Sequence, residues 1–125
     1  VTVKDGAYYI NNVAKPNLVF TTGTTYRFSI SNAIFTEHPF GFRDQDGKNY
    51  DYNVNINTEA QITHVQLLVT SSTPPNMEYF CQNHPGMGSQ IFVVPRDNHH
   101  SNKNKQSDRK KLFHLITKFT ILPGT

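Results

Sequence analysis

The sequence contains a single cysteine and no tryptophan among its 125 residues. One cysteine excludes an internal disulfide, a four-cysteine zinc site and a dithiol redox motif. It also excludes a dinuclear centre bridged by two thiolates. No run of 18 apolar residues occurs, so the sequence predicts no transmembrane segment.

Charged residues are also few, at 17%, whereas nine Phe and six Tyr supply large side chains for a core. This composition excludes a wholly disordered chain, and the length is that of one domain. Residues 1–94 hold five Lys or Arg and seven Asp or Glu, a net charge of −2. Residues 95–125 hold seven Lys or Arg and two Asp or Glu, a net charge of +5. The sequence therefore predicts a mildly acidic domain over 1–94, with no nucleic-acid role expected for this body, and a basic tail over 95–125.

The tail begins with a polar stretch, residues 96–111, that contains no apolar residue and is typical of a mobile linker. Four apolar residues at helical spacing follow, namely Leu112, Leu115, Ile116 and Phe119. We therefore expect a tail that is either disordered or a short helix, and whose basic side chains can contact an anionic surface. The chain starts at Val1 without a signal peptide, so we expect a processed chain or a fragment.

The body consists of short segments in which apolar and polar residues alternate. Thr25–Ile30 and Gln61–Val69 show this alternation most clearly, and it predicts half-buried strands. No segment of the body has a sustained helical period. About eight such strands predict an all-β fold, a Greek-key antiparallel β-sandwich.

An Asp-rich stretch, Asp44–Gly47, has a faint likeness to a calcium-binding loop. Its glycine comes too early for an EF-hand loop, and no Glu follows at the required position. The stretch therefore predicts a polar hairpin turn.

The segment with the clearest chemistry is Tyr79–Gly88, which contains Cys81, His84 and Met87 in a C-x2-H-x2-M spacing. A strand is expected to deliver Cys81, and a tight turn rich in Pro and Gly to deliver the other two. Thiolate, imidazole and thioether together favour copper over magnesium, calcium or manganese. One more imidazole would complete a site of two His and one Cys with a weak axial Met. His38 is the best candidate, because Pro39 stiffens the chain beside it and the following phenylalanines can exclude water.

Each of these residues also has an ordinary structural interpretation. Cys81 could be a buried strand cysteine, His84 a turn residue and Met87 a gap filler in the core. Their joint spacing, together with the upstream His38, favours a metal site. His64 lies in the middle of a strand and is expected to be a cross-strand or surface histidine. His99 and His100, in the tail, are expected to have no native role.

On these motifs, the segment His38–Val94 resembles the cupredoxin (type 1 blue copper) family, especially its small plastocyanin- and amicyanin-like members. The resemblance implies a single Cu(I)/Cu(II) ion. It implies His38 and His84 as imidazole ligands, Cys81 as the thiolate ligand and Met87 as the weak axial ligand.

The resemblance further implies a one-electron carrier and not an enzyme, since no coordination position is left for a substrate. A redox protein partner would dock near His84, and the location would be extracytoplasmic: periplasmic, extracellular or membrane-associated. Two other functions stay open at this point. One is a structural or adhesion β-sandwich domain of a larger surface or virion protein, and the other is a copper-delivery protein.

Overall fold

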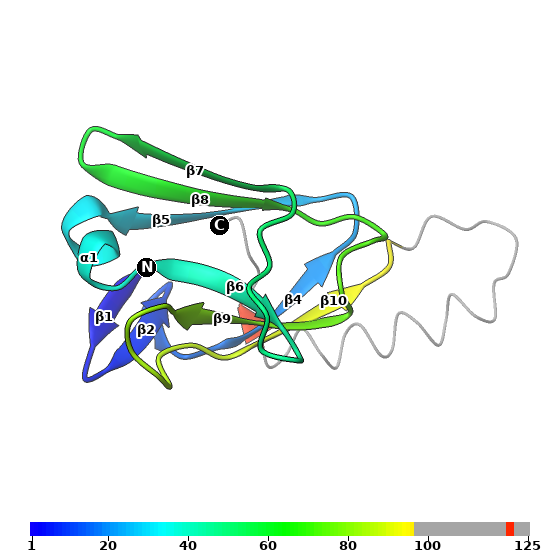
Figure 1. Cartoon of the computed structure of the whole chain (residues 1–125), viewed down its shortest axis with the longest axis horizontal. Coiled ribbons are helices and arrows are strands. Elements are labelled where there is room, and N and C mark those ends of the chain that lie inside the picture. Colours follow the sequence, from blue (N-terminus) through cyan, green and yellow to red (C-terminus); the bar gives the residue numbers. More distant parts are fainter. Residues whose placement is uncertain (97–119, 122–125) are drawn as a thin grey trace, which may run out of the picture.

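Two β-sheets face each other and enclose a core rich in aromatic residues (Figure 1). The computed structural model describes residues 1–96 and 120–121, so the expectations for 97–119 and 122–125 lie outside the described part. The elements in chain order are β1 (Thr2–Lys4), β2 (Ala7–Ile10), β3 (Val13–Ala14), β4 (Asn17–Thr21), β5 (Thr25–Ser31), α1 (Asn32–Glu37), β6 (Phe40–Asp44), β7 (Val54–Glu59), β8 (Ile62–Leu68), β9 (Asn76–Cys81), β10 (Gln90–Val94) and β11 (Thr120–Ile121).

The larger sheet has the order β11-β4-β10-β9-β6, and the opposite sheet has the order β5-β8-β7. Strand β9 is antiparallel to both β10 and β6, whereas β4 and β10 run parallel. The chain passes repeatedly from one sheet to the other, as in a Greek-key sandwich. The expected β-sandwich is therefore confirmed.

Strand β11 differs from what the sequence led us to expect of the tail. Thr120 and Ile121 pair in parallel with Asn17 and Leu18 of β4, so these two tail residues are neither disordered nor helical. The residues at helical spacing, Leu112 to Phe119, lie outside the described part, and the two residues that follow them add to an open sheet edge.

The alternation read from the sequence corresponds to burial in the two central strands. In β5, Tyr26, Phe28 and Ile30 are buried, and the residues between them face outward. In β8, Thr63, Val65 and Leu67 are buried in the same way. Side chains that alternate along a strand point to opposite faces, so each strand presents one apolar face to the core.

Aromatic rings cross the space between the sheets. The ring of Phe28, on β5, lies 4.9 Å from that of Phe40 and 5.8 Å from that of Phe42, both on β6. It also lies 6.0 Å from the ring of Phe20, on β4. Burial of each such side chain contributes about 1.5–3 kcal/mol, so these contacts hold the sheets together and fix the position of β6.

A short helix, α1, connects β5 to β6 in a body whose sequence has no sustained helical period. The hydroxyl of Ser31 accepts a hydrogen bond from the main-chain N–H of Ile34 and caps the helix. The N–H of His38 donates to the carbonyl of Ile34 and ends it. A helix of six residues is too short to show a helical period in the sequence.

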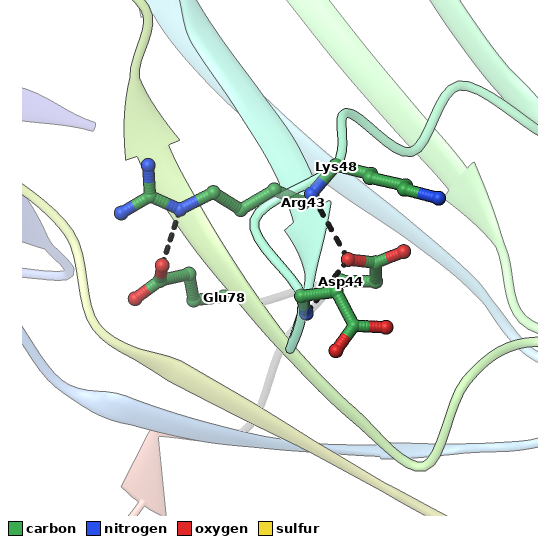
Figure 2. A network of polar contacts seen from close by, with 5 residues as sticks. Arg43, Asp44, Lys48 and Glu78 are labelled. Atoms are coloured by element: carbon green, nitrogen blue, oxygen red, sulfur yellow. Dashed lines mark hydrogen bonds and ion pairs between the residues drawn. The ribbon is translucent and has the colours of Figure 1, made fainter.

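The far end of β6 is held by polar contacts (Figure 2). The Asp44 carboxylate accepts hydrogen bonds from the main-chain N–H groups of Asp46 and Lys48. This carboxylate therefore stabilises a turn, as the sequence predicted, and does not point to a calcium site. Beside it, Arg43 on β6 forms an ion pair with Glu78 on β9.

A third, smaller sheet, β1-β2-β3, lies at the end of the sandwich that also holds α1 and the start of β6 (Figure 1). Its middle strand is fixed to the β9–β10 connection by a hydrogen bond from the N–H of Tyr8 to the carbonyl of Met87, at 2.9 Å. The residues of interest in the sequence therefore gather at one end of the molecule. Among residues 1–96 and 120–121, no helix has the length and apolar character that crossing a bilayer requires.

Candidate metal centre

Three of the residues singled out in the sequence meet at this end of the sandwich. His38 ends α1, Cys81 ends β9, and His84 lies in the turn that follows β9. One potential ligand atom from each lies within 4.8 Å of the other two. In residues 1–96 and 120–121, this is the one group of three or more His, Cys, Asp or Glu side chains that comes together in this way.

The distances between the donor atoms have a defined chemical meaning. The sulfur of Cys81 lies 3.7 Å from Nδ1 of His38 and 3.6 Å from Nδ1 of His84. First-row metals such as zinc form bonds of about 2.0 Å to nitrogen and about 2.3 Å to sulfur. With an angle of about 120° between the bonds, the donors are about 3.7 Å apart. The two sulfur–nitrogen distances therefore match those expected around a metal ion held by one sulfur and two nitrogen donors.

Hydrogen bonding alone gives a weaker explanation of this spacing. A thiol can donate its one hydrogen to one imidazole, and its sulfur is only a weak acceptor for an N–H of the other. The imidazole rings lie with their centroids 4.7 Å apart and are not stacked, since their planes meet at 46°. Two rings that both turn Nδ1 toward one sulfur are better explained by a metal ion that both imidazoles and the sulfur could bind.

Pairing of neighbouring strands brings the candidate ligand residues together. Phe40 at the start of β6 is paired with Cys81 at the end of β9, which places His38 beside the turn after β9. The N–H of Gln82 donates to the carbonyl of Pro39 at 3.1 Å and extends this pairing. The side-chain amide of Asn83 donates to the carbonyl of Glu37 at 3.1 Å, so the turn is also tied to the end of α1.

Met87, the fourth residue of the predicted site, lies in the buried core three residues after His84, with 1% of its surface exposed. The next residue, Gly88, passes directly over β9: a Cβ atom there would lie 1.7 Å from the carbonyl oxygen of Tyr79. Only glycine permits this approach. The close passage holds the Met87 segment against the strand that carries Cys81.

The environment of the candidate centre is dry on one side and open on the other. Cys81 is 4% exposed, and Phe40, which follows His38 and Pro39, is 1% exposed. His38 is half-buried, and His84 is exposed. A metal held here would therefore be shielded by the core and would reach the surface through the His84 ring.

The main-chain N–H groups of Asn32 and Gln82 do not donate to the Cys81 sulfur. The N–H of Asn32 donates to the carbonyl of Gln61, at 2.8 Å, and the N–H of Gln82 donates to Pro39. Strand and turn pairing already uses these donors.

One residue that contacts the centre, Tyr8, was not singled out in the sequence. Its hydroxyl donates a 2.8 Å hydrogen bond to the carbonyl of His38, although the two residues are 30 positions apart. Burial, together with the hydrogen bond and charge of the adjacent Cys81, raises the pKa of Tyr8 well above its ordinary value. The local sequence indicated only an apolar strand over Ala7–Ile10, so this contact could not be read from it.

His64 lies apart from this cluster, on the outer face of the opposite sheet. Its Nδ1 is 2.9 Å from the hydroxyl of Ser29, its partner across β5 and β8. This agrees with the expected cross-strand or surface histidine. His99 and His100 lie outside the described residues.

No protein-family model matches the chain, and no curated protein matches it. Solved structures of titin domains do match, at low identity. An NMR structure of a mutant titin domain is 12% identical with a TM-score of 0.40, covering 70% of this chain and 90% of that one. A chimeric titin protein carrying a decorin peptide is 12% identical with a TM-score of 0.39, covering 66% and 91%. Scores this low carry no functional argument, and the β-sandwich rests on the strands described above.

Proposed function

We propose that this β-sandwich is a type 1 copper protein of the cupredoxin kind that carries one electron at a time. The observation that supports the proposal is the pair of distances from the Cys81 sulfur to Nδ1 of His38 and of His84, 3.7 and 3.6 Å. One thiolate and two imidazoles in a trigonal arrangement, with a weak thioether, form the blue-copper ligand set. Met87 is the thioether that the proposal assigns.

A bound copper ion would supply the change between Cu(I) and Cu(II). The protein supplies a rigid donor set that need not rearrange between these states, because strand pairing and the Gly88 contact fix the ligand segments. The buried Cys81 side keeps water away from the ion, which tunes its reduction potential. With all ligand positions taken by protein atoms, the proposal includes no catalysis.

His84 is the proposed route for the electron, since its ring is exposed while Cys81 is buried. The residues that flank it in the turn, Asn83, Pro85 and Gly86, are also exposed. A small patch of this kind fits a transient redox protein partner. We place this exchange in an extracytoplasmic compartment, where a single metal-bound thiol needs no reducing environment.

The test is to add Cu(II) to the purified metal-free protein and record its visible spectrum. The proposal expects an intense thiolate-to-copper charge-transfer band that ascorbate bleaches, and a reversible wave in voltammetry. Cys81→Ala should abolish the band. His64→Ala, which changes a histidine outside the cluster, should retain it.

Other outcomes would identify the alternative functions. A protein without any thiolate band is not a copper carrier, and the β-sandwich would then act as a structural or adhesion domain. Tight Cu(I) binding without a reversible wave would indicate copper delivery in place of electron transfer.

A further inference from the structure

Tyr8 contacts two candidate ligand segments at once. Its hydroxyl donates to the carbonyl of His38 at 2.8 Å, and its main-chain N–H donates to the carbonyl of Met87 at 2.9 Å. His38 and Met87 lie in different segments of the chain, and no other contact described above joins both.

The position of Tyr8 is itself well determined. Its side chain is fully buried, and its ring packs edge-on against Phe40 at 5.1 Å. Its carbonyl accepts a hydrogen bond from the N–H of Lys15, and β2 is paired on both sides by β1 and β3. A side chain held this firmly can hold its hydrogen-bond partners in place.

Burial alone does not explain these contacts, because a second tyrosine provides a comparison. Tyr79 is also fully buried, and its hydroxyl donates to a main-chain carbonyl, that of Pro16, at 2.7 Å. Pro16 is not a candidate ligand, whereas His38 is. The two tyrosines thus make similar hydrogen bonds in one core, and only that of Tyr8 ends on a ligand residue.

We propose that Tyr8 is a positioning residue of the metal centre, which holds the His38 and Met87 segments where a copper ion needs them. This inference rests on the proposed copper function. Groups that orient metal ligands from outside the first layer of contacts typically change metal affinity about 10- to 100-fold when removed. Tyr8→Phe removes the hydroxyl and retains the ring, so it isolates this role from packing.

The experiment compares wild type, Tyr8→Phe and the matched control Tyr79→Phe. Copper affinity is measured by competition with a chelator, and the charge-transfer band is recorded for each loaded protein. Tyr8→Phe should bind copper about 10-fold or more weakly and should have a shifted band. Tyr79→Phe should resemble wild type in both, although each variant loses one buried hydrogen bond.

A second measurement uses the unaltered protein and so does not depend on how the variants fold. Cu(I), which is diamagnetic, is added while the NMR signals of the two buried tyrosine side chains are followed. The Tyr8 signals should shift much more than those of Tyr79.

The outcomes separate this inference from the proposed function. If wild type shows the band, but both variants match it in affinity and band position, Tyr8 has no positioning role and the copper function stands. Unshifted Tyr8 signals on Cu(I) binding would likewise exclude the positioning role. If wild type shows no band, the copper function fails, and the role of Tyr8 in it fails as well.

Discussion

A Cβ atom added to Gly88 would lie 1.7 Å from the carbonyl oxygen of Tyr79, far inside any allowed contact. The position of a Cβ is fixed by its own main chain and the carbonyl oxygen is itself main chain, so no side-chain rotation could relieve the clash. The turn that carries His84 and Met87 is therefore pressed against the strand that carries Cys81, and the closeness depends on a missing side chain.

Gly88→Ala should accordingly destabilise the protein by at least about 3 kcal/mol and weaken copper binding, because the turn must move off β9. Urea denaturation measures the first effect and the charge-transfer band the second. Gly86→Ala is the matched control: it lies in the same turn with open space around it, but at a φ of 76°. It should cost only about 1–2 kcal/mol, from backbone strain. If both variants lose the same free energy of unfolding, the close contact between Gly88 and the Tyr79 carbonyl is contradicted.

Substitutions of Met87 should separate packing from metal ligation. Met87→Leu conserves volume and should cost less than about 1.5 kcal/mol, whereas Met87→Ala leaves a cavity and should cost about 2–5 kcal/mol. If Met87 is the axial ligand, the leucine variant should retain the charge-transfer band but change the reduction potential. A potential identical to that of wild type would remove Met87 from the ligand set.

His84 offers the cleanest ligand substitution because it is exposed. His84→Ala should change the stability of the metal-free protein by no more than about 0.5 kcal/mol. It should abolish stabilisation by copper, which for wild type amounts to about 2.7 kcal/mol at a free concentration 100 times the dissociation constant. Thermal melts with and without copper measure both. His64→Ala should retain the stabilisation by copper. If this variant also loses it, the assignment of the candidate site is contradicted.

Stability should fall at alkaline pH because burial raises the pKa of Tyr79 above its ordinary value. In the unfolded chain this phenol releases its proton near pH 10, while the folded state keeps it. The tyrosine therefore contributes full stability below pH 10 and loses it as the pH rises further, by about 1.4 kcal/mol per pH unit. Urea midpoints measured from pH 8 to 11 should decline less steeply for Tyr79→Phe than for wild type. Parallel declines would show that Tyr79 ionises equally in both states.

Local patterns were sufficient to predict the strands that form the core. The alternation in Thr25–Ile30 and Gln61–Val69 is a property of adjacent residues, and burial in β5 and β8 follows it. The helix Asn32–Glu37 was missed because a single capped turn and a half leaves no periodic signal. Strand β11 was missed because its pairing with β4 depends on a distant sheet edge.

In the candidate site, too, some residues could be predicted from local sequence and others could not. Cys81, His84 and Met87 are close in sequence, and their spacing alone indicated a soft metal. Metal ligation by these residues stays a prediction. Tyr8 and Gly88 act through contacts with residues far along the chain or with main-chain atoms. Residue type at these positions carries no chemical signature, so only the three-dimensional structure reveals their contacts with the candidate site.

The pairing of β6 with β9 has a consequence for the order of events during folding. His38 and Cys81 are 43 residues apart, and their donors meet only once these two strands have joined. The complete donor set is therefore absent until this long-range pairing has formed, and the proposed ion would find its full site only afterwards. Copper should therefore enter an already folded chain, leaving the refolding rate unchanged and slowing the rate at which the native state is lost.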